Sequence, residues 1–465
     1  MSPIDVIERF DMLVLGSGEA GKYLAWTIGN QGNRVALVER RYVGGSCPNI
    51  ACLPSKNFVH SAKVAWYAQR LPEFGLKLAA SGVNMAAVIE RKRKMVAGLV
   101  DLNRSRFAAS HAEFIHGEGS FVAPRTISVE STSGNKRVLT ADIVIVSTGS
   151  QAIIPAIPGL RESTPMTHVE ELELDVLPEH LVVLGGGYVG LEFAQAMRRF
   201  GSAVTVVDRS KRLLPHEDED TVGALMELLE AEGIKFHLDT VVQAVHGRSG
   251  EAVEIRIDGA TGEQILNASH ILVATGRSPN TREIGLENAG IELQETGHIK
   301  VDASLKTTAQ GVYAVGDCAG SPHFTHIAYD DFRVVREQLN GGHRSTTGRQ
   351  VPYTLFTDPE LAHVGFHEHQ AISLGIRHRV AKLPMSAVLR TRTLGETDGF
   401  LKAMVAENDQ ILGFTALGVG VGEMLAPVQL AMSAGLPYTA LRDLIVTHPT
   451  LTEGLVYLFS SIPKR

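Results

Sequence analysis

The stretch Asp11-Met12-Leu13-Val14-Leu15-Gly16-Ser17-Gly18-Glu19-Ala20-Gly21 sets three glycines in the order G-x-G-x-x-G directly after a short apolar run. A helix-like segment follows, and then a second apolar run over residues 34–38 that ends at Glu39. In a βαβ nucleotide-binding unit the first glycine permits the tight turn, the second lets a pyrophosphate approach the backbone, and the third lets helix and strand pack closely. The helix N-terminus then faces the phosphates, and Glu39 is placed to accept hydrogen bonds from a ribose.

The same pattern recurs later, where the apolar run 181–184 leads into Gly185-x-Gly187-x-x-Gly190. A helix-like segment and an apolar run over 203–207 follow, and that run ends at Asp208, with the acid at the same spacing from the first glycine as in the first copy. One such motif is a weak signal, but two copies in matching register are a strong one. The sequence therefore predicts two dinucleotide sites. A flavin and a hydride carrier are the natural pair, because a flavin can pass electrons onward to a disulfide.

The acid of the second motif bears on which nicotinamide binds there. A carboxylate at Asp208 repels a ribose 2′-phosphate, which favours NADH over NADPH. Arg209, Lys211 and Arg212 stand close by in the sequence and could offset that repulsion. We therefore expect FAD together with NADH or NADPH, with NADH favoured.

Two of the three cysteines lie five positions apart in Gly44-Gly45-Ser46-Cys47-Pro48-Asn49-Ile50-Ala51-Cys52-Leu53-Pro54-Ser55-Lys56. In a regular helix this spacing separates two residues by ~7.5 Å of rise, whereas the Cα atoms of a disulfide must lie within ~7 Å. The pair can therefore close only if the helix is not fully formed at Cys47. Pro48 fits, because proline suits the first helical position.

This reading places Cys47 at or just before a helix N-terminus, where the dipole stabilises a thiolate. Lys56 follows Cys52 by four residues, so it shares a helix face with that thiol and should lower its pKa further. A structural disulfide or two inert buried thiols is the alternative, because C-x4-C alone is a weak pattern. The third cysteine, Cys318, is expected to be a small buried residue.

The composition bounds the class of protein. A chain of 465 residues is long enough for about three domains, and 46 glycines with 44% hydrophobic residues suit an α/β protein rich in tight turns. A net charge of −7 does not favour nucleic acid or an anionic membrane surface, and three cysteines point to a reducing compartment. No apolar run reaches ~18 residues, and the first strand-like run starts too early for a signal peptide. We expect a cytoplasmic protein.

Other strand ends mark further candidate positions. Two apolar runs end in Thr148-Gly149 and Thr275-Gly276, and ligands bind beyond the carboxyl ends of such strands. A third ends in Gly316-Asp317, where the carboxylate either bonds polyol hydroxyls or caps a helix. The segment 325–339 is expected to be a helix. Near the C-terminus, Glu453 could orient His448 as an acid–base group if the chain folds back at Pro449, although a His-Pro loop is more often structural.

Taken in order, these segments resemble the class I pyridine nucleotide–disulfide oxidoreductases over essentially the whole chain. The runs Phe324-Thr325-His326, with Asp330 to Arg333, and Gly435 to Asp443 make it most similar to the mercuric-reductase-like and reactive-chlorine-resistance-protein-like branch. The resemblance implies two Rossmann-like domains, for FAD and NAD(P), and a C-terminal α+β dimerisation domain. The expected divisions are 1–150 for the first part of the FAD-binding domain, 151–278 for NAD(P), 279–345 for a central domain completing the FAD site, and 346–465 for dimerisation.

The resemblance also implies roles. Cys52 would face the flavin and Cys47 would meet the substrate, while Lys56 would pair with Glu192 near the flavin. Tyr188 would cover the nicotinamide pocket. His448, held by Glu453, would come from the partner subunit of a homodimer. No metal ligands are expected. The residues expected to bind the two dinucleotides are Gly16, Gly18, Glu19, Ala20, Gly21, Glu39, Gly45, Ser46, Lys56, Thr148, Gly149, Gly185, Gly187, Tyr188, Gly190, Asp208, Arg209, Thr275, Gly276, Arg277, Gly316 and Asp317.

Three departures from the family pattern stand out. Ala51 replaces the usual glycine before the second cysteine, and Pro48 follows the first, so both should stiffen this turn. The chain ends Ser460-Ser461-Ile462-Pro463-Lys464-Arg465 without the vicinal cysteines of mercuric reductases. The leading hypothesis is a reductase that passes electrons from NAD(P)H through FAD and the Cys47–Cys52 disulfide to a disulfide, a soft metal ion or a related acceptor. The alternatives are a dihydrolipoamide dehydrogenase, or a flavin-bound redox sensor without turnover.

Overall fold

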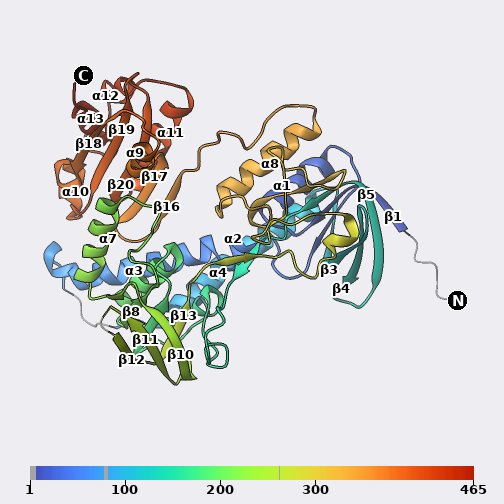
Figure 1. The fold of residues 1–465 in the computed structure, drawn as a ribbon, viewed down its shortest axis with the longest axis horizontal. Coiled ribbons are helices and arrows are strands. Elements are labelled where there is room, and N and C mark those ends of the chain that lie inside the picture. The colour runs from blue at the N-terminus through green and yellow to red at the C-terminus, as the bar shows by residue number, and fades with distance from the viewer. Residues whose placement is uncertain (1–6, 78–81, 261, 465) are drawn as a thin grey trace.

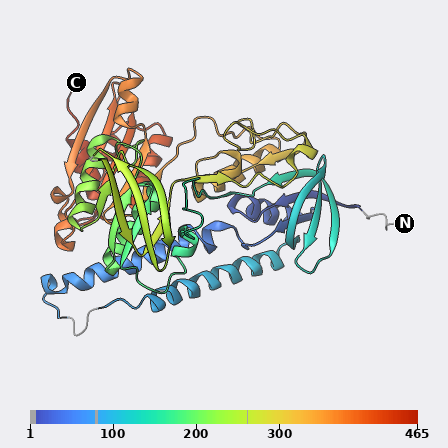
Figure 2. The ribbon, with the colours of Figure 1, turned by 60° about the horizontal axis from the view of Figure 1, so that its bottom comes forward.

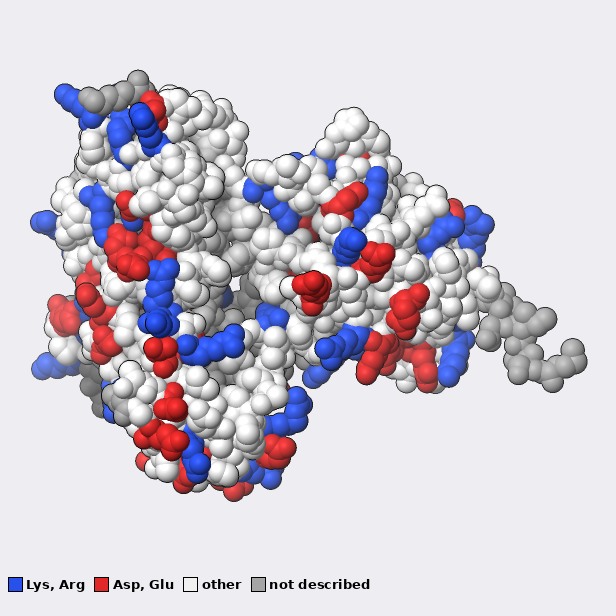
Figure 3. Space-filling model, in the orientation of Figure 1, with Lys and Arg blue, Asp and Glu red and all other residues white. Residues whose placement is uncertain are grey.

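A computed structural model describes residues 7–77, 82–260 and 262–464, and it is built around three separate sheets with covering helices (Figure 1). The predicted fold class is confirmed: a mixed sheet with a parallel core and a parallel sheet, each carrying one glycine motif, are followed by an antiparallel C-terminal sheet. No helix in these ranges is long and apolar enough to cross a membrane. Lysine and arginine side chains are interspersed with acidic ones over the face shown in Figure 3.

The first sheet has a parallel core in the order β3-β2-β1-β5-β15, and β4 pairs antiparallel with β3 and β5 at its far end. Its central strand is apolar and buried at the end that meets the first glycine motif, because residues on both of its faces pack into apolar clusters. The strands are β1 (Ile7–Leu15), β2 (Val35–Glu39), β3 (Ala112–Ala123), β4 (Thr126–Ser131), β5 (Lys136–Val146) and β15 (Val312–Ala314).

Two helices pack beside each other against this sheet, α1 (Glu19–Asn30) and α8 (Thr325–Leu339), although they lie far apart in the sequence. Their contact is aromatic, with Tyr23 edge-on to Tyr329 at 4.9 Å between ring centroids. Helix α8 covers the residues predicted for it. Two long helices, α3 (Cys52–Arg70) and α4 (Met85–Ala109), run along one side of the molecule between the first sheet and the other two (Figure 2).

The second sheet is parallel in the order β13-β7-β8-β9 and carries the second glycine motif between β7 and α6. An antiparallel three-stranded sheet, β10-β11-β12, packs against it through an apolar cluster. The elements are β7 (His180–Leu184), α6 (Tyr188–Phe200), β8 (Ala203–Val207), α7 (Glu219–Ala231), β9 (Lys235–His237), β10 (Val241–Arg248), β11 (Ala252–Gly259), β12 (Gly262–Ala268) and β13 (His270–Val273).

Two short strands, β6 (Ser150–Ala152) and β14 (Arg277–Pro279), form an antiparallel pair where the chain passes between the first two sheets. The C-terminal sheet is antiparallel in the order β16-β17-β20-β19-β18, and α11 and α13 pack on it. Its elements are β16 (Tyr353–Leu355), β17 (Glu360–Gly365), β18 (His378–Pro384), β19 (Phe400–Ala406), β20 (Ile411–Gly418), α11 (Leu425–Ser433) and α13 (Glu453–Ser460). This sheet lies against α7 (Figure 1). Residues from all three regions line one cavity.

Candidate active site

The first glycine motif forms a tight turn between β1 and α1. Gly16 has a φ of +97°, and a Cβ there would collide with the Ser147 carbonyl. A Cβ on Gly21 would come within 2.5 Å of the Gly16 carbonyl, so helix and turn can touch only because both residues are glycine. Gly18 caps α1 without a side-chain hydrogen bond, which leaves the N–H groups of the first turn available to phosphate oxygens.

The second glycine motif repeats this geometry between β7 and α6. Gly185 has a φ of +106°, and a Cβ there would approach the Ala274 carbonyl to 2.6 Å. Gly187 differs, because a Cβ at that position would meet no atom within 4 Å. The first glycine is therefore required by close packing, whereas the second faces open space at the N-terminus of α6. A pyrophosphate fits that arrangement.

The acids at the ends of β2 and β8 lie over their glycine loops. Glu39 accepts hydrogen bonds from the Ser17 backbone N–H at 2.8 Å and from the Ser17 hydroxyl at 2.7 Å. Asp208 accepts one from the Gly186 backbone N–H at 2.7 Å. Each carboxylate therefore holds its glycine loop in place and also lies at the end of the strand where the ribose is expected. The sequence pattern predicted the ribose contact but not the hydrogen bonds to the loop.

One cavity of about 1530 Å³ joins the first glycine motif, both cysteines and the first turn of α6. Pockets for drug-sized ligands commonly measure about 300–1,000 Å³, so this space suits a dinucleotide together with a second molecule. Because the glycine turn and the thiols open into the same space, the residues present fit FAD. The expected site residues that line it are Gly18, Glu19, Ser46, Cys47, Cys52, Lys56, Gly149, Tyr188, Glu192, Arg277, Gly316 and Asp317.

The segment between the cysteines is broken into two helices. A single turn, α2 (Ser46–Asn49), contains Cys47 as its second residue and Pro48 as its third, and α3 begins at Cys52. Ala51 separates them with φ −129° and ψ −110°. The expectation that no continuous helix joins the two thiols is confirmed, and Cys47 lies in the first turn of a helix as expected, although that helix is the single turn α2. The thiol at the N-terminus of the 19-residue helix is Cys52, because the break falls between the cysteines.

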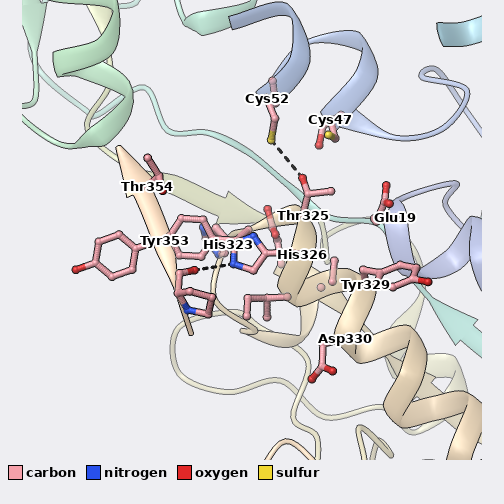
Figure 4. Close-up of a pocket in the computed structure, with 18 of the residues that line it drawn as sticks. Glu19, Cys47, Cys52, His323, Thr325, His326, Tyr329, Asp330, Tyr353 and Thr354 are labelled. Carbon is pink, nitrogen blue, oxygen red and sulfur yellow. Dashed lines mark hydrogen bonds between the residues drawn. The ribbon is translucent and has the colours of Figure 1, made fainter. Parts of the chain in front are cut away.

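The Cys52 thiol points toward the start of α8, where its sulfur lies 3.2 Å from the Thr325 hydroxyl (Figure 4). A hydrogen bond from Cys47, with further help from Thr325 and the Lys56 charge, lowers the pKa of Cys52 to about 6. The same hydrogen bond and burial raise the pKa of Cys47. Of the two thiols, Cys52 is therefore the one that ionises at neutral pH. Nothing in the sequence around Thr325 predicts that its hydroxyl contacts a thiol.

Lys56 forms an ion pair with Glu192 across α3 and α6, with Nζ 2.6 Å from Oε2. Glu192 also accepts the Phe356 backbone N–H at 3.0 Å, and the Lys56 ammonium lies 4.7 Å from the centre of the Phe356 ring. The pair therefore connects the cysteine helix, the second nucleotide-binding sheet and the segment leading into the C-terminal sheet.

The strand ends of the first region meet at β6 and β15. Asp317 accepts a hydrogen bond from the Ser150 hydroxyl, and Arg277 donates to the same hydroxyl at 2.8 Å. Asp317 caps no helix: α8 begins only at Thr325, with Phe324 at its N-cap. Asp331 in α8, which sequence reasoning missed, is fully buried and accepts the Gly316 backbone N–H at 2.7 Å.

The remaining expected binding residues lie around these two turns. Gly45 has a φ of +84°, and a Cβ there would approach the Gly18 Cα to 2.7 Å, so the cysteine segment packs directly on the first glycine motif. Thr275 donates its hydroxyl hydrogen to the Ile153 carbonyl at 3.2 Å. The others are Ala20, buried in α1; Thr148, directly before Gly149; Gly190, packed on Gly185; Arg209, exposed just after β8; and Gly276, with a φ of +129°.

His448 and Glu453 form the expected pair, with Nδ1 3.0 Å from Oε2. Tyr457 donates to the same carboxylate at 2.9 Å, so Glu453 is held from α13 while the imidazole is exposed. His448 is not among the residues that line the cavity. Within one chain the structure therefore separates this pair from the thiols.

Comparison with known proteins bears on these features together. The family model described as pyridine nucleotide-disulphide oxidoreductase matches residues 10–331, and the model of that family's dimerisation domain matches residues 351–459. The chain belongs to the pyridine nucleotide–disulfide oxidoreductases. As a member it is an FAD-dependent oxidoreductase that uses a pyridine nucleotide, and its dimerisation domain supports a homodimer.

Three relatives of this oxidoreductase cover nearly the whole chain. Escherichia coli (strain K12) RclA, a probable pyridine nucleotide-disulfide oxidoreductase, is 36% identical over 98% of this chain and 100% of its own length. The dihydrolipoyl dehydrogenase of Thermus scotoductus is 34% identical over 99% and 98%, and the mercuric reductase of Staphylococcus aureus is 32% identical over 96% and 81%. A solved Cu(II) complex of Escherichia coli RclA, titled an HOCl-induced flavoprotein disulfide reductase, superposes with a TM-score of 0.89 at 34% identity, covering 98% of this chain and 99% of that one.

Proposed function

We propose that this oxidoreductase delivers two electrons from NAD(P)H to its acceptor through the Cys47–Cys52 pair. One observation carries the proposal: both thiols open into the cavity that reaches the first glycine motif and the first turn of α6. The lowered pKa of Cys52 supports the proposal, because the thiolate is the reactive form of a cysteine and an inert structural pair does not require one.

The residues that would hold FAD are those of the first glycine motif, Glu39, Asp317 and Lys56. FAD, when bound, supplies an acceptor for the hydride of NAD(P)H and passes the electron pair on. The protein's part is to set the thiols on one side of that position and Tyr188 on another. The Lys56 ammonium compensates the negative charge of the Cys52 thiolate, and Glu192 fixes the ammonium in place.

With a disulfide acceptor R–S–S–R, two exchanges balance the reaction. As the Cys47 sulfur attacks one sulfur of the acceptor, its thiol proton passes to His448 of the partner subunit; a Cys47–S bond forms, the acceptor S–S bond breaks and one RS⁻ leaves. The Cys52 thiolate then attacks the Cys47 sulfur, which releases the second RS⁻ and restores the Cys47–Cys52 disulfide. The acceptor has gained two electrons. Two protons complete its conversion to thiols: His448 of the partner subunit returns the proton taken from Cys47, and solvent supplies the second.

Two further points belong to the proposal. The carboxylate of Asp208 beside the second glycine motif favours NADH over NADPH. The Cu(II) complex of RclA suggests a soft metal ion as one acceptor class, and the dihydrolipoyl dehydrogenase relative, with the His448–Glu453 pair, suggests a dithiol–disulfide one.

The test is an acceptor panel run under argon with NADH and with NADPH on the FAD-loaded enzyme. Hg(II), Cu(II), oxidised lipoamide, glutathione disulfide and quinones are each compared between the wild type and a Cys47→Ser variant. We expect steady oxidation of NADH with at least one acceptor, and loss of it in the variant. Turnover that survives Cys47→Ser contradicts the thiol relay, and absence of turnover with every acceptor favours a redox sensor. Brisk reduction of NAD⁺ by dihydrolipoamide favours a dihydrolipoamide dehydrogenase.

A further inference from the structure

Tyr188 stands at the junction of the second glycine motif and the cavity. It is the first residue of α6, directly after Gly187, and its side chain lines the cavity. Glu192, which pairs with Lys56, lies one helical turn further on. The position of the Tyr188 ring therefore affects the space beside both the second glycine motif and the Lys56–Glu192 pair.

A fully buried carboxylate holds the hydroxyl of this tyrosine. Glu217 Oε1 accepts hydrogen bonds from Tyr188 Oη at 2.8 Å and from Tyr353 Oη at 2.5 Å. The two tyrosine rings stack with their centroids 5.6 Å apart. Burial raises the pKa of Glu217. Glu217 Oε1 therefore holds the hydroxyl of Tyr188, and the Tyr353 ring packs on the Tyr188 ring.

The second tyrosine of this arrangement belongs to the C-terminal sheet. Tyr353 begins β16 and contacts His367 Nε2 at 3.0 Å, and its ring stacks on Phe324 at 5.8 Å with the two planes nearly parallel. Asp218, next to Glu217, is held in turn by His369 Nδ1 at 2.8 Å. The C-terminal domain therefore fixes the loop that carries Glu217 from two sides.

We propose that Glu217 and Tyr353 are positioning residues that hold Tyr188 at the cavity wall and so keep the pyridine-nucleotide site open. This inference rests on the proposed function, in which the second glycine motif binds NAD(P)H. The physical reason is preorganisation. A released Tyr188 ring can turn into the part of the cavity beside the first turn of α6, and a nucleotide would then have to displace and reorder it on binding.

The experiment measures the dissociation constant of NAD⁺ for the FAD-loaded dimer, followed by the change in flavin absorbance on titration. Glu217→Leu removes both hydrogen bonds and Tyr353→Phe removes one. We expect each to weaken NAD⁺ binding about threefold to tenfold, the range that the net free energy of one hydrogen bond supplies. Glu217→Gln should bind within about twofold of the wild type, because its amide oxygen can accept from both hydroxyls.

Tyr67→Phe is the matched control. Tyr67 in α3 also donates its hydroxyl hydrogen to a carboxylate of the C-terminal domain, Glu396, but this contact does not involve Tyr188. It should leave the NAD⁺ dissociation constant unchanged. A structural role for Glu217 alone would lower the melting temperature equally in the Leu and Gln variants without separating their affinities.

Wild-type affinity in both Tyr353→Phe and Glu217→Leu would overturn the inference. Should Glu217→Leu fail to fold, the Tyr353→Phe variant alone tests the inference. Wild-type affinity of Tyr353→Phe for NAD⁺ is then sufficient to reject the inference. Failure of the proposed function is a separate outcome, because a wild-type enzyme that does not bind NAD⁺ at all would show it before any variant is compared.

Discussion

Among single residues, Cys52 has the surroundings that reactivity requires. A thiol acts as a nucleophile or electron donor only when ionised, and three features favour its thiolate: a hydrogen bond from Cys47, the Thr325 hydroxyl and the charge of Lys56. The first residue of a long helix adds the helix dipole. Cys318, which is fully buried with a raised pKa, has none of these features.

A pH titration of the fully reduced enzyme tests this at the residue scale. A lowered pKa means that Cys52 keeps its thiolate at neutral pH and takes up a proton as the pH falls through about 6. Thr325→Val keeps the shape but removes the hydroxyl, so the midpoint should rise by about one pH unit, the equivalent of one hydrogen bond. The thiolate absorbance against pH measures it. An unchanged midpoint in Thr325→Val would remove this hydroxyl from the account.

Among elements, the decisive feature is the short α2 turn packed on the first glycine motif. Gly44 and Gly45 both have positive φ, and the closest approach is between Gly45 and the Gly18 backbone. This contact brings the start of the cysteine segment to the glycine turn of the first dinucleotide site. The break at Ala51 then lets Cys47 and Cys52 approach each other, which a continuous helix would prevent.

The contact predicts that Gly45→Ala releases FAD. Its Cβ would lie 2.7 Å from the Gly18 Cα, so either the cysteine segment or the glycine turn must move. Gly32→Ala is the control, since Gly32 also has a positive φ of +90° but a Cβ there meets no atom within 4 Å. Both variants carry the conformational cost of about 1 kcal/mol, and only Gly45→Ala should purify with a lowered flavin-to-protein absorbance ratio. Equal flavin content in the two would contradict the steric argument.

At this scale the sequence predicts some elements well and others poorly. The helix 325–339 and the two glycine turns follow from local periodicity and from glycine chemistry, and the structure has them at the predicted places. The helix boundary at Cys52 was missed, because the break at Ala51 carries no local breaker. Pro48 was expected at the first helical position, but it is the third residue of α2, because a proline is tolerated throughout the first turn of a helix.

For the whole molecule, the contacts between the regions are the features that are hardest to predict from the sequence. Glu192 with Lys56 is 136 positions apart, and Cys52 with Thr325 is 273 apart. The first followed only from the family resemblance and the second was not foreseen, because no periodicity links residues at such distances. A similar contact forms where Asp358 accepts hydrogen bonds from Arg199 at 2.5 Å and Lys63 at 2.9 Å.

Asp358→Asn should destabilise the enzyme by about 2 kcal/mol, because Arg199 and Lys63 each lose one charged hydrogen-bond acceptor while keeping Glu232 and Glu396. Although burial opposes it, the charges of Arg199 and Lys63 hold the pKa of Asp358 below its usual value. The wild type should therefore keep its advantage above about pH 4 and lose it as the pH falls further. Thermal melts across this range measure the difference. Asp142→Asn, at an exposed pair with Arg9, is the control and should change stability by at most about 0.5 kcal/mol. Equal melting temperatures for the two variants would refute the role of the buried contact.

A shared active site predicts activity in a mixed dimer. Subunits carrying Cys52→Ser and subunits carrying His448→Gln are each expected to be inactive as homodimers. Their heterodimer has one site with intact cysteines from one chain and an intact histidine from the other, so it should regain up to half of the wild-type activity. Anaerobic turnover of a purified, differently tagged heterodimer measures it. Should His448 act within its own chain, both sites would carry a lesion and the heterodimer would stay inactive.

The most direct test of the electron route is alkylation of the thiols before and after one equivalent of NADH under argon, read by mass spectrometry of the FAD-loaded enzyme. We expect that Cys47 and Cys52 of the oxidised enzyme resist the reagent and that both become labelled after NADH, while the buried Cys318 stays unlabelled throughout. Labelling of Cys47 and Cys52 that does not depend on NADH would contradict the claim that electrons pass through their disulfide.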